Sequence, residues 1–317
     1  MKPRRVAIAA ALAVAVGAAR VGLAAPEKVL EGEFARQRWL AGASERDVVV
    51  GDHRWRVVEA GAGPTIVLVH GFTGSKENWL PLMRRLARTH RVIAPDLPGW
   101  GDSERVDGAD YGPLAQAERL KSFLATLESK PVLLLGHSMG GQIVGLLAAR
   151  EPQVAGRIGL MSSAGVRFAD NDFGRAVLAG ENPFEVTDRA SLDRYLGIVF
   201  VDPPWVPWPA SAALIRQRRD DVAFEQQVLD GIGRGPQALQ LEGELDRIAM
   251  PVLLLWCRDD RVIDVSAAEI FHRGLRASRT VLLAGCGHMP MMAQPDNVAE
   301  AVGAFLEAPL PSGEGLG

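Results

Sequence analysis

The fold is decided by the stretch VLLLGHSMGG, residues 132–141. It begins with apolar residues that predict a buried strand, and it continues into helical spacing of apolar positions over residues 139–150. Between strand and helix stands the pattern G-x-S-x-G, with Ser138 at its centre. Such a turn holds the serine in a strained conformation, and the glycines on either side remove side chains that would collide. We therefore expect Ser138 to be an exposed nucleophile at a helix N-terminus.

Around this stretch, short β-branched runs alternate with longer helical stretches. This rhythm is typical of an α/β fold with a mostly parallel sheet. Residues 47–50 and 55–60 flank Gly51 and Asp52 and predict a hairpin. An eight-stranded sheet is completed by strands at residues 65–69, 91–94, 132–135, 157–161, 252–256 and 280–283. Flanking helices are predicted at residues 75–87, 115–127, 139–150, 266–275 and 296–306.

One interval, between Gly165 and Pro236, shows helical pieces but no clear buried strand. A structureless loop of that length is improbable in a compact domain, so the pattern favours a helical cap at residues 167–236. Two further crossover helices with irregular ends are the alternative. The cap divides the predicted core into residues 46–166 and 237–308, and a flexible, glycine- and proline-rich tail follows at 309–317.

The N-terminal residues 1–25 have the pattern of an export signal, a basic cluster followed by an apolar run at residues 6–19. That run spans roughly 21 Å as a helix, which is short of a bilayer core, and only an extension past Arg20 reaches it. Two interpretations therefore stay open. The segment is an uncleaved signal anchor in a bacterial-type inner membrane, facing the periplasm, or a signal peptide whose cleavage leaves a periplasmic or secreted protein. Residues 26–45 then predict an amphipathic linker helix.

The overall composition excludes several other classes of protein. A formal charge of −3 and a pI near 6.1 give no electrostatic footprint for nucleic acid. Only two cysteines are present, Cys257 and Cys286, which excludes a thiolate metal cluster. No phosphate-binding loop or dinucleotide fingerprint occurs, so we expect neither a metal nor a cofactor. The oligomeric state is not indicated.

Further motifs agree with the serine turn. The residues His70-Gly71-Phe72 follow the third strand, the segment DLPGWGDS at 96–103 follows the fourth, and His288 follows the last. In these motifs the chain resembles the α/β-hydrolase family, from about residue 47 to residue 306. The resemblance implies a catalytic order of Ser, acid, His, with Ser138 as nucleophile and His288 as base. It also implies an oxyanion hole formed by the backbone N–H groups of Phe72 and Met139.

The acid of this triad is chosen among Asp259, Asp260 and Asp264, which all follow the seventh strand. The family spacing Trp-Gly-x-x-Asp favours Asp260, with Cys257 in the glycine position. Asp264 suits the start of the next helix, where its charge lies near the positive end of the helix dipole. Some relatives carry the acid after the sixth strand, but this chain has serines there.

Within the family, the chain is most similar to the membrane-anchored monoacylglycerol lipase and esterase branch. The shared features are the N-terminal apolar segment, HGFT at 70–73 with Lys76 and Trp79, SMGGQ at 138–142, VIDVS at 262–266 and CGH at 286–288. This resemblance implies hydrolysis of lipid-like or medium-chain esters through an acyl-enzyme. Carbon–carbon bond hydrolysis, perhydrolysis or haloperoxidase chemistry, and acyl transfer are the alternatives on the same triad. A non-catalytic binding protein is a third, disfavoured hypothesis.

The cap supplies candidate substrate contacts. Its aromatic side chains predict an apolar acyl pocket over Ser138, formed by Phe168, Phe200, Trp205 and Trp208, with Phe173 and Phe184. Packing in the cap's own core is the alternative for each of them.

The two cysteines lie at the ends of neighbouring predicted strands, close to Asp260 and His288. A disulfide would brace the acid and base loops, but its geometry is demanding, so two buried free thiols are the favoured prediction.

Overall fold

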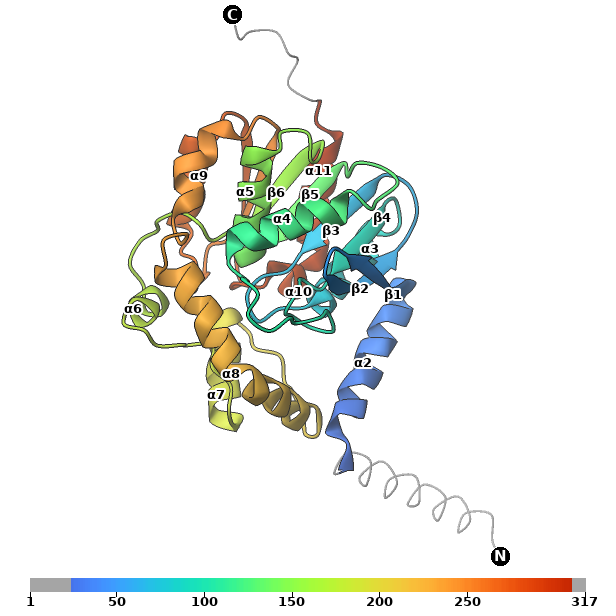
Figure 1. The fold of residues 1–317 in the computed structure, drawn as a ribbon, viewed down its shortest axis with the longest axis vertical. Helices are drawn as coiled ribbons and strands as arrows, with labels where there is room; N and C mark the ends of the chain where they lie inside the picture. Colours follow the sequence, from blue (N-terminus) through green and yellow to red (C-terminus); the bar gives the residue numbers. More distant parts are fainter. Residues whose placement is uncertain (1–23, 310–317) are drawn as a thin grey trace, which may run out of the picture.

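The computed structural model describes residues 24–309. Its centre is an eight-stranded sheet with the order β1-β2-β4-β3-β5-β6-β7-β8 (Figure 1). β1 (Ala43–Val50) pairs antiparallel with β2 (His53–Ala60), which pairs antiparallel with β4 (Arg91–Pro95). All other neighbours are parallel, which confirms the mostly parallel sheet. The parallel part adds β3 (Thr65–Val69), β5 (Leu133–His137), β6 (Arg157–Met161), β7 (Val252–Cys257) and β8 (Ser278–Leu283).

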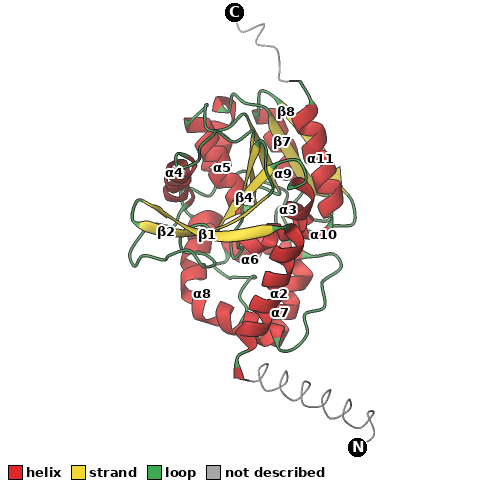
Figure 2. Ribbon diagram, turned by 90° about the vertical axis from the view of Figure 1, so that its right-hand side faces the viewer, coloured by secondary structure: helices red, strands yellow, loops and turns green. Residues whose placement is uncertain are grey.

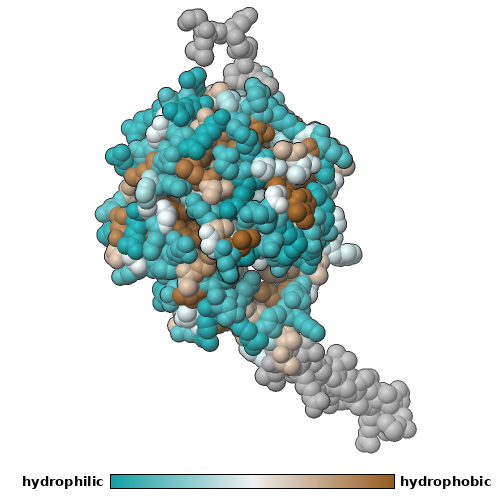
Figure 3. Space-filling model, viewed as in Figure 1, coloured by the Kyte–Doolittle hydropathy of each residue, from teal (hydrophilic) through white to brown (hydrophobic). Residues whose placement is uncertain are grey.

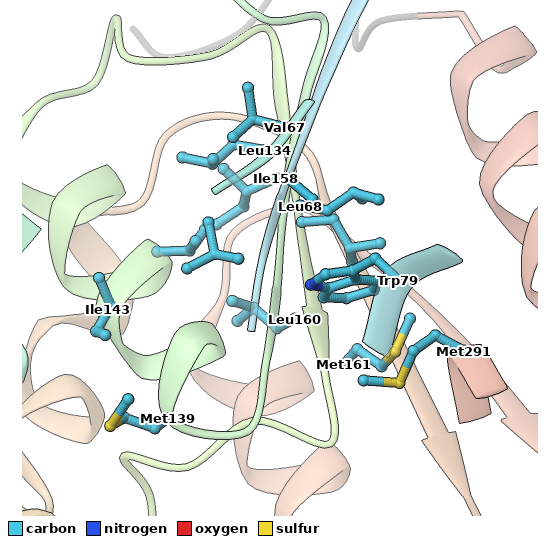
Figure 4. Packing of buried hydrophobic residues seen from close by; sticks show 14 of the residues in the cluster. Val67, Leu68, Trp79, Leu134, Met139, Ile143, Ile158, Leu160, Met161 and Met291 are labelled. Atoms are coloured by element: carbon cyan, nitrogen blue, oxygen red, sulfur yellow. The ribbon is translucent and has the colours of Figure 1, made fainter. Parts of the chain in front are cut away.

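The central strands are continuously apolar because both faces of the sheet are covered. Every residue of β3, β5 and β7 is buried. Figure 4 shows Val67, Leu134 and Ile158 of three adjacent strands, with Ile143 on one side of the sheet and Trp79 on the other.

The predicted strands differ from the observed ones mainly at their ends. β1 begins at residue 43 instead of 47, and β5 runs on to residue 137, directly before Ser138.

Helices cover both faces of the sheet, with α4 and α5 on one side and α3 and α11 on the other (Figure 2). The predicted helix at 75–87 is divided into a 3-10 turn, η1, and α3. Pro81 explains the division, because its missing N–H interrupts the helical ladder. Two short helices, η2 and α10, had no counterpart in the prediction. The bounds are η1 (Lys76–Trp79), α3 (Leu80–Leu86), α4 (Pro113–Leu124), α5 (Met139–Arg150), η2 (Gln240–Arg247), α9 (Ser266–Gly274), α10 (Pro290–Ala293) and α11 (Pro295–Glu307).

Between β6 and β7, residues 167–236 hold α6 (Asp172–Leu178), α7 (Arg189–Val199) and α8 (Ala210–Arg234), and no strand. We call residues 167–236 the helical insertion. The long α8 extends away from the sheet toward the start of α2 (Pro26–Ala41) (Figure 1), and Arg216 of α8 forms an ion pair of 2.5 Å with Glu27 of α2. The exact domain boundaries stay a prediction.

The N-terminal part departs from the expected linker helix at residues 26–45. Gly42 has a positive φ of 63° and ends α2, and the chain enters β1 at the next residue. The predicted export segment lies outside the described residues up to residue 23, and the predicted tail lies outside them from residue 310. Within residues 24–309, no helix is long and apolar enough to cross a membrane. The face shown in Figure 3 is mainly hydrophilic, with apolar residues in separate small patches.

Candidate active site

Ser138 stands between β5 and α5, as the sequence predicts. Its φ is 55°, a left-handed value that costs a non-glycine residue about 1–3 kcal/mol and is typical of functional sites. The turn needs its glycines, because a Cβ on Gly136 would lie 2.2 Å from the Gly140 carbonyl oxygen. A Cβ on Gly140 would lie 2.3 Å from the His70 carbonyl oxygen. The backbone therefore presents Ser138 at the N-terminus of α5, only 7% exposed.

Asp260 and His288 lie side by side at the ends of β7 and β8. The His288 Nδ1 lies 2.9 Å from Asp260 Oδ2 and 3.1 Å from Oδ1, and both residues are buried. Asp260 is itself held by the backbone, since Oδ1 accepts hydrogen bonds from the N–H groups of Val262 at 2.9 Å and Ile263 at 3.1 Å. This arrangement fixes the tautomer of His288 that carries its proton on Nδ1 and leaves Nε2 as a base.

The other two candidate acids have different partners. Asp259 accepts a hydrogen bond from the Gly285 N–H at 3.1 Å. Asp264 accepts one from the Ser266 N–H at 2.9 Å, at the start of α9, as expected for a residue that precedes a helix. Of the three carboxylates, only Asp260 contacts His288.

His288 also lies next to the serine turn. Its carbonyl oxygen accepts a hydrogen bond of 2.7 Å from His137 Nε2, and the rings of these two residues are 4.7 Å apart. His137 directly precedes Ser138 in the chain. Within the described residues, no hydrogen bond joins His288 Nε2 to Ser138. The structure thus joins Asp260 directly to His288 and places His288 beside the serine turn.

The two predicted oxyanion residues lie on either side of Ser138. Met139 is the first residue of α5, so its N–H has no partner within the helix. Phe72 belongs to the loop after β3, which packs tightly on the serine, because a Cβ on Gly71 would lie 2.8 Å from Ser138 Cβ. Phe72, Ser138 and Met139 border the same cavity. Their roles stay predictions.

Two buried histidines hold the turns around this site. His70 accepts a hydrogen bond of 2.9 Å from the Leu97 N–H and donates one of 2.8 Å to the Gly71 carbonyl. Burial lowers the pKa of His70. Burial, together with the neighbouring His288, lowers the pKa of His137 well below its usual value. Both rings are therefore neutral and bridge backbone segments.

A comparison with known families decides the identity of the fold. The model of the alpha/beta hydrolase family matches residues 66–301, which include Phe72, Ser138, Asp260 and His288. The chain belongs to the alpha/beta hydrolase family.

The relatives of this hydrolase include monoacylglycerol lipases. The monoacylglycerol lipase ABHD6 of Mus musculus is 27% identical over 262 residues, which cover 78% of this chain and 76% of that protein. The Homo sapiens protein of the same name is 28% identical over the same length. The similarity to the monoacylglycerol lipase branch is thereby confirmed.

Solved structures agree with these relatives. The crystal structure of a membrane phospholipase A, described as a bacterial virulence factor, is 36% identical with a TM-score of 0.85. The match covers 96% of this chain and 98% of that one. A 2-hydroxy-6-oxo-6-phenylhexa-2,4-dienoate hydrolase from Rhodococcus is 22% identical, with a TM-score of 0.70 over 84% of this chain and 99% of that one, and shows the fold alone. This chain is therefore a hydrolase that is similar to lipases and esterases.

The hydrolase has a disulfide between Cys257 and Cys286, so the prediction of two free thiols is wrong. Cys257 pairs in register with Leu283 at the end of β8, and the turn that follows brings Cys286 back to the end of β7. The Cα atoms are 5.4 Å apart, within the range that a disulfide spans. The bridge ties the loop of Asp260 to the loop of His288.

A buried charge cluster, which the sequence did not reveal, lies behind the loop that carries Phe72. Lys76 is 1% exposed, and its Nζ lies 3.0 Å from Asp96 Oδ2 and 2.6 Å from Asp102 Oδ2. The Lys76 N–H also donates to Asp96 Oδ1 at 2.6 Å. Burial by itself lowers the pKa of Lys76, but the charges of Asp96, Glu77 and Asp102 outweigh it and raise the pKa above its usual value. Since Leu97 follows Asp96 and bonds to His70, the cluster fixes both ends of the loop that carries Phe72.

Ser138 opens into an apolar cavity of about 480 Å³ between the core and the helical insertion. The core contributes Phe72, Ser138, Met139, Val262 and Ile263. The insertion contributes side chains that the sequence singled out, Phe168, Phe173 and Phe184, and others that it did not, among them Val177, Leu229 and Ile232. Only the three-dimensional packing of α6 against the C-terminal half of α8 reveals the second group.

Three of the aromatic residues predicted for this cavity lie elsewhere. Phe200 is buried in the hydrophobic core, and its backbone packs on Gly287. Trp205 and Trp208 are 81% and 53% exposed and do not border the cavity. They stand in the proline-rich stretch directly before α8, on the outside of the insertion. Their assignment to the acyl pocket is therefore wrong.

Proposed function

We propose that this hydrolase cleaves carboxylic esters of lipid-like or medium-chain acyl groups. Ser138, His288 and Asp260 act as its triad. The observation that carries the proposal is that Ser138 opens into a large apolar cavity while the hydrogen-bonded pair of Asp260 and His288 lies beside it. A serine at a strained turn, a base of fixed tautomer and an apolar chamber together suit acyl transfer from an ester.

In the first half-reaction, His288 Nε2 takes the proton of Ser138 as Oγ attacks the ester carbonyl. The negative charge on the carbonyl oxygen is stabilised by the N–H groups of Phe72 and Met139; one such donor is typically worth about 3 kcal/mol. Asp260 stabilises the resulting imidazolium. His288 then protonates the leaving alcohol, and the acyl group remains on Ser138.

In the second half-reaction, His288 takes a proton from water, and the water oxygen attacks the acyl carbon. The bond between Ser138 Oγ and the acyl carbon breaks, Oγ regains a proton from His288, and the carboxylic acid leaves. The reaction needs no cofactor.

The acyl group fits the cavity for a chemical reason. The aromatic rings and aliphatic side chains that line the cavity remove the methylene groups of the acyl chain from water. This burial contributes about 0.8 kcal/mol of binding free energy for each methylene. The names of the relatives, monoacylglycerol lipase and phospholipase A, support a lipid ester as substrate.

The test combines a fluorophosphonate probe with a series of nitrophenyl esters and monoacylglycerols. We expect wild-type protein to be labelled and to hydrolyse medium-chain esters, and Ser138→Ala to lose labelling and about 10⁶-fold in kcat. Ser163→Ala is the matched control, because Ser163 is a buried serine near the same helix whose hydroxyl bonds only to the Ala164 carbonyl. Labelling that persists in Ser138→Ala, or wild type that is neither labelled nor active, refutes the proposal.

We also propose that the protein is exported and acts at or near a membrane. The disulfide supports this, since such bridges persist in oxidising compartments, and so does the apolar segment at residues 6–19 that follows a basic cluster. Fractionation of the native host, with protease added to spheroplasts, tests the location. If the protein stays intact when protease is added to spheroplasts, it lies inside the inner membrane, and export is contradicted.

A further inference from the structure

A second, much smaller cavity lies near Ser138, bordered by Gly71, which packs against the Ser138 side chain. Its volume is about 10 Å³, which is the space that one water molecule needs. The polar residues Thr73, Asn78, Tyr195 and His288 are among those that border it. Thr73, Asn78 and Tyr195 are partly exposed, so the cavity lies close to bulk solvent.

The two cavities divide the catalytic groups between them. Ser138 borders the large apolar cavity, and His288 borders the small one. Phe72 and Phe184 border both cavities, which therefore meet at these two stacked rings, whose centroids are 6.0 Å apart. An acyl group on Ser138 would thus occupy the large apolar cavity, whereas the base that must activate water borders the small cavity.

Backbone strain singles out the same place. Thr73 has a φ of 56°, a conformation that β-branched residues rarely adopt. Strain of this kind persists only where the surrounding structure enforces it, and it gathers at functional sites. Thr73 follows Phe72, so one turn supplies both an expected oxyanion donor and a hydroxyl at the small cavity.

We propose that this small cavity is the binding site of the water that hydrolyses the acyl-enzyme, with Thr73 and Tyr195 as its positioning residues. This inference rests on the proposed function. The bound water gives a proton to His288 Nε2, and its oxygen forms a bond to the acyl carbon. The Ser138 ester bond then breaks, and the proton returns to Ser138 Oγ. The size of the cavity admits water and excludes a leaving alcohol such as glycerol.

The experiment measures deacylation separately from acylation. Two esters of one medium-chain acid, a nitrophenyl ester and a glyceryl ester, are turned over by Thr73→Val and by Tyr195→Phe. Acid quenching and intact-mass spectrometry give the acylated fraction, and kcat divided by that fraction gives the deacylation rate constant. Fluorophosphonate labelling measures the reactivity of Ser138 without any need for water. Thr73→Ser, which keeps the hydroxyl, is the control for Thr73→Val, which keeps the branched shape.

We expect the deacylation rate constant to fall about three- to tenfold in each variant, as for loss of one hydrogen bond, with the same value for both esters. The labelling rate should equal that of wild type, and Thr73→Ser should deacylate normally. A fall in labelling rate that matches the fall in kcat would assign these residues to acylation and overturn the water site. Unchanged deacylation in both variants would overturn it as well. Wild type that is never labelled would refute the proposed function itself.

Discussion

The two walls of the large cavity are built differently. The core wall is held by backbone hydrogen bonds and a covalent bridge. Asp260 accepts hydrogen bonds from two backbone N–H groups, and the disulfide joins the loop of Asp260 to the loop of His288. The insertion wall is held by side chains, such as the partly buried ion pair of Arg218 and Glu225 at 2.6 Å and the ring contacts of Phe184 with Phe72 and Phe173.

This difference separates chemistry from specificity. Groups that are fixed by the backbone keep their geometry when nearby side chains change, which suits a triad. A wall made of side chains changes shape with each substitution, which suits a surface that selects substrates. Substitutions in the core wall should therefore lower the free energy of unfolding and kcat. Substitutions in the insertion wall should change the preferred length of the acyl chain.

The largest effect is expected from the charge cluster behind the core wall. Lys76→Met leaves Asp96 buried without its cation, which should lower the free energy of unfolding by about 3–5 kcal/mol. Urea unfolding followed by circular dichroism measures the change. Lys121→Met is the matched control, because Lys121 pairs with Glu151 on the surface, and it should leave stability nearly unchanged. Equal effects of the two substitutions would contradict the structural role of the cluster.

The disulfide should have the next largest effect. Its cysteines are 29 residues apart, and replacement of both by serine should cost about 3–4 kcal/mol of unfolding free energy in the chain-entropy description. The kcat should fall under conditions where the variant is fully folded, because the loops of Asp260 and His288 lose their link. Reduction with dithiothreitol should reproduce both losses in wild type and change nothing in the double variant. Two titratable thiols in unfolded, unreduced wild type would disprove the bridge.

A substitution in the insertion wall should act on the substrate instead. Val177 borders the cavity and is buried, so Val177→Trp should shorten the space for the acyl chain. We expect kcat/KM for long-chain esters to fall at least about tenfold while short-chain esters are affected less. The control is Trp205→Ala, since Trp205 is exposed and lies outside the cavity. If Trp205→Ala shifts the chain-length profile and Val177→Trp does not, the description of the insertion wall is wrong.

The smallest effect concerns pH and again belongs to the core. Burial lowers the pKa of His137 and His70 below 6.5, so the folded protein keeps these rings neutral where the unfolded chain already binds protons. Above pH 6.5 the two rings are neutral in the folded and the unfolded protein, so they do not affect the free energy of unfolding. Below pH 6.5 the free energy of unfolding should fall by up to about 1.4 kcal/mol per pH unit for each ring. Urea unfolding across this range measures the slope. His137→Gln removes one such ring and should lose stability less steeply on acidification; an identical slope would contradict the assignment.

The sequence predicted those parts of the molecule that depend on local patterns. β3, β6 and α5 begin and end where the apolar runs and the serine turn place them. The pairing of Asp260 with His288 agrees with the family spacing after Trp256. These features can be predicted because each depends on neighbouring residues or on a fixed strand order.

The features that the sequence did not predict depend on contacts between distant residues. Lys76 meets carboxylates that lie 20 and 26 residues away, and no local pattern indicates that they surround it. The disulfide depends on the turn after β8. The aromatic residues of the insertion are alike in type, yet Phe168 borders the cavity and Trp205 faces solvent. The packing of α6 and α8 decides this difference, and the sequence pattern does not show it.

The most direct test of the central claim is to locate the acyl group during turnover. Wild-type protein that is hydrolysing a medium-chain nitrophenyl ester is quenched with acid, digested and mapped by tandem mass spectrometry. We predict an acyl adduct on the peptide that carries Ser138, absent from Ser138→Ala and present in Ser163→Ala. Sustained hydrolysis by Ser138→Ala, or an adduct on another residue, would contradict the account.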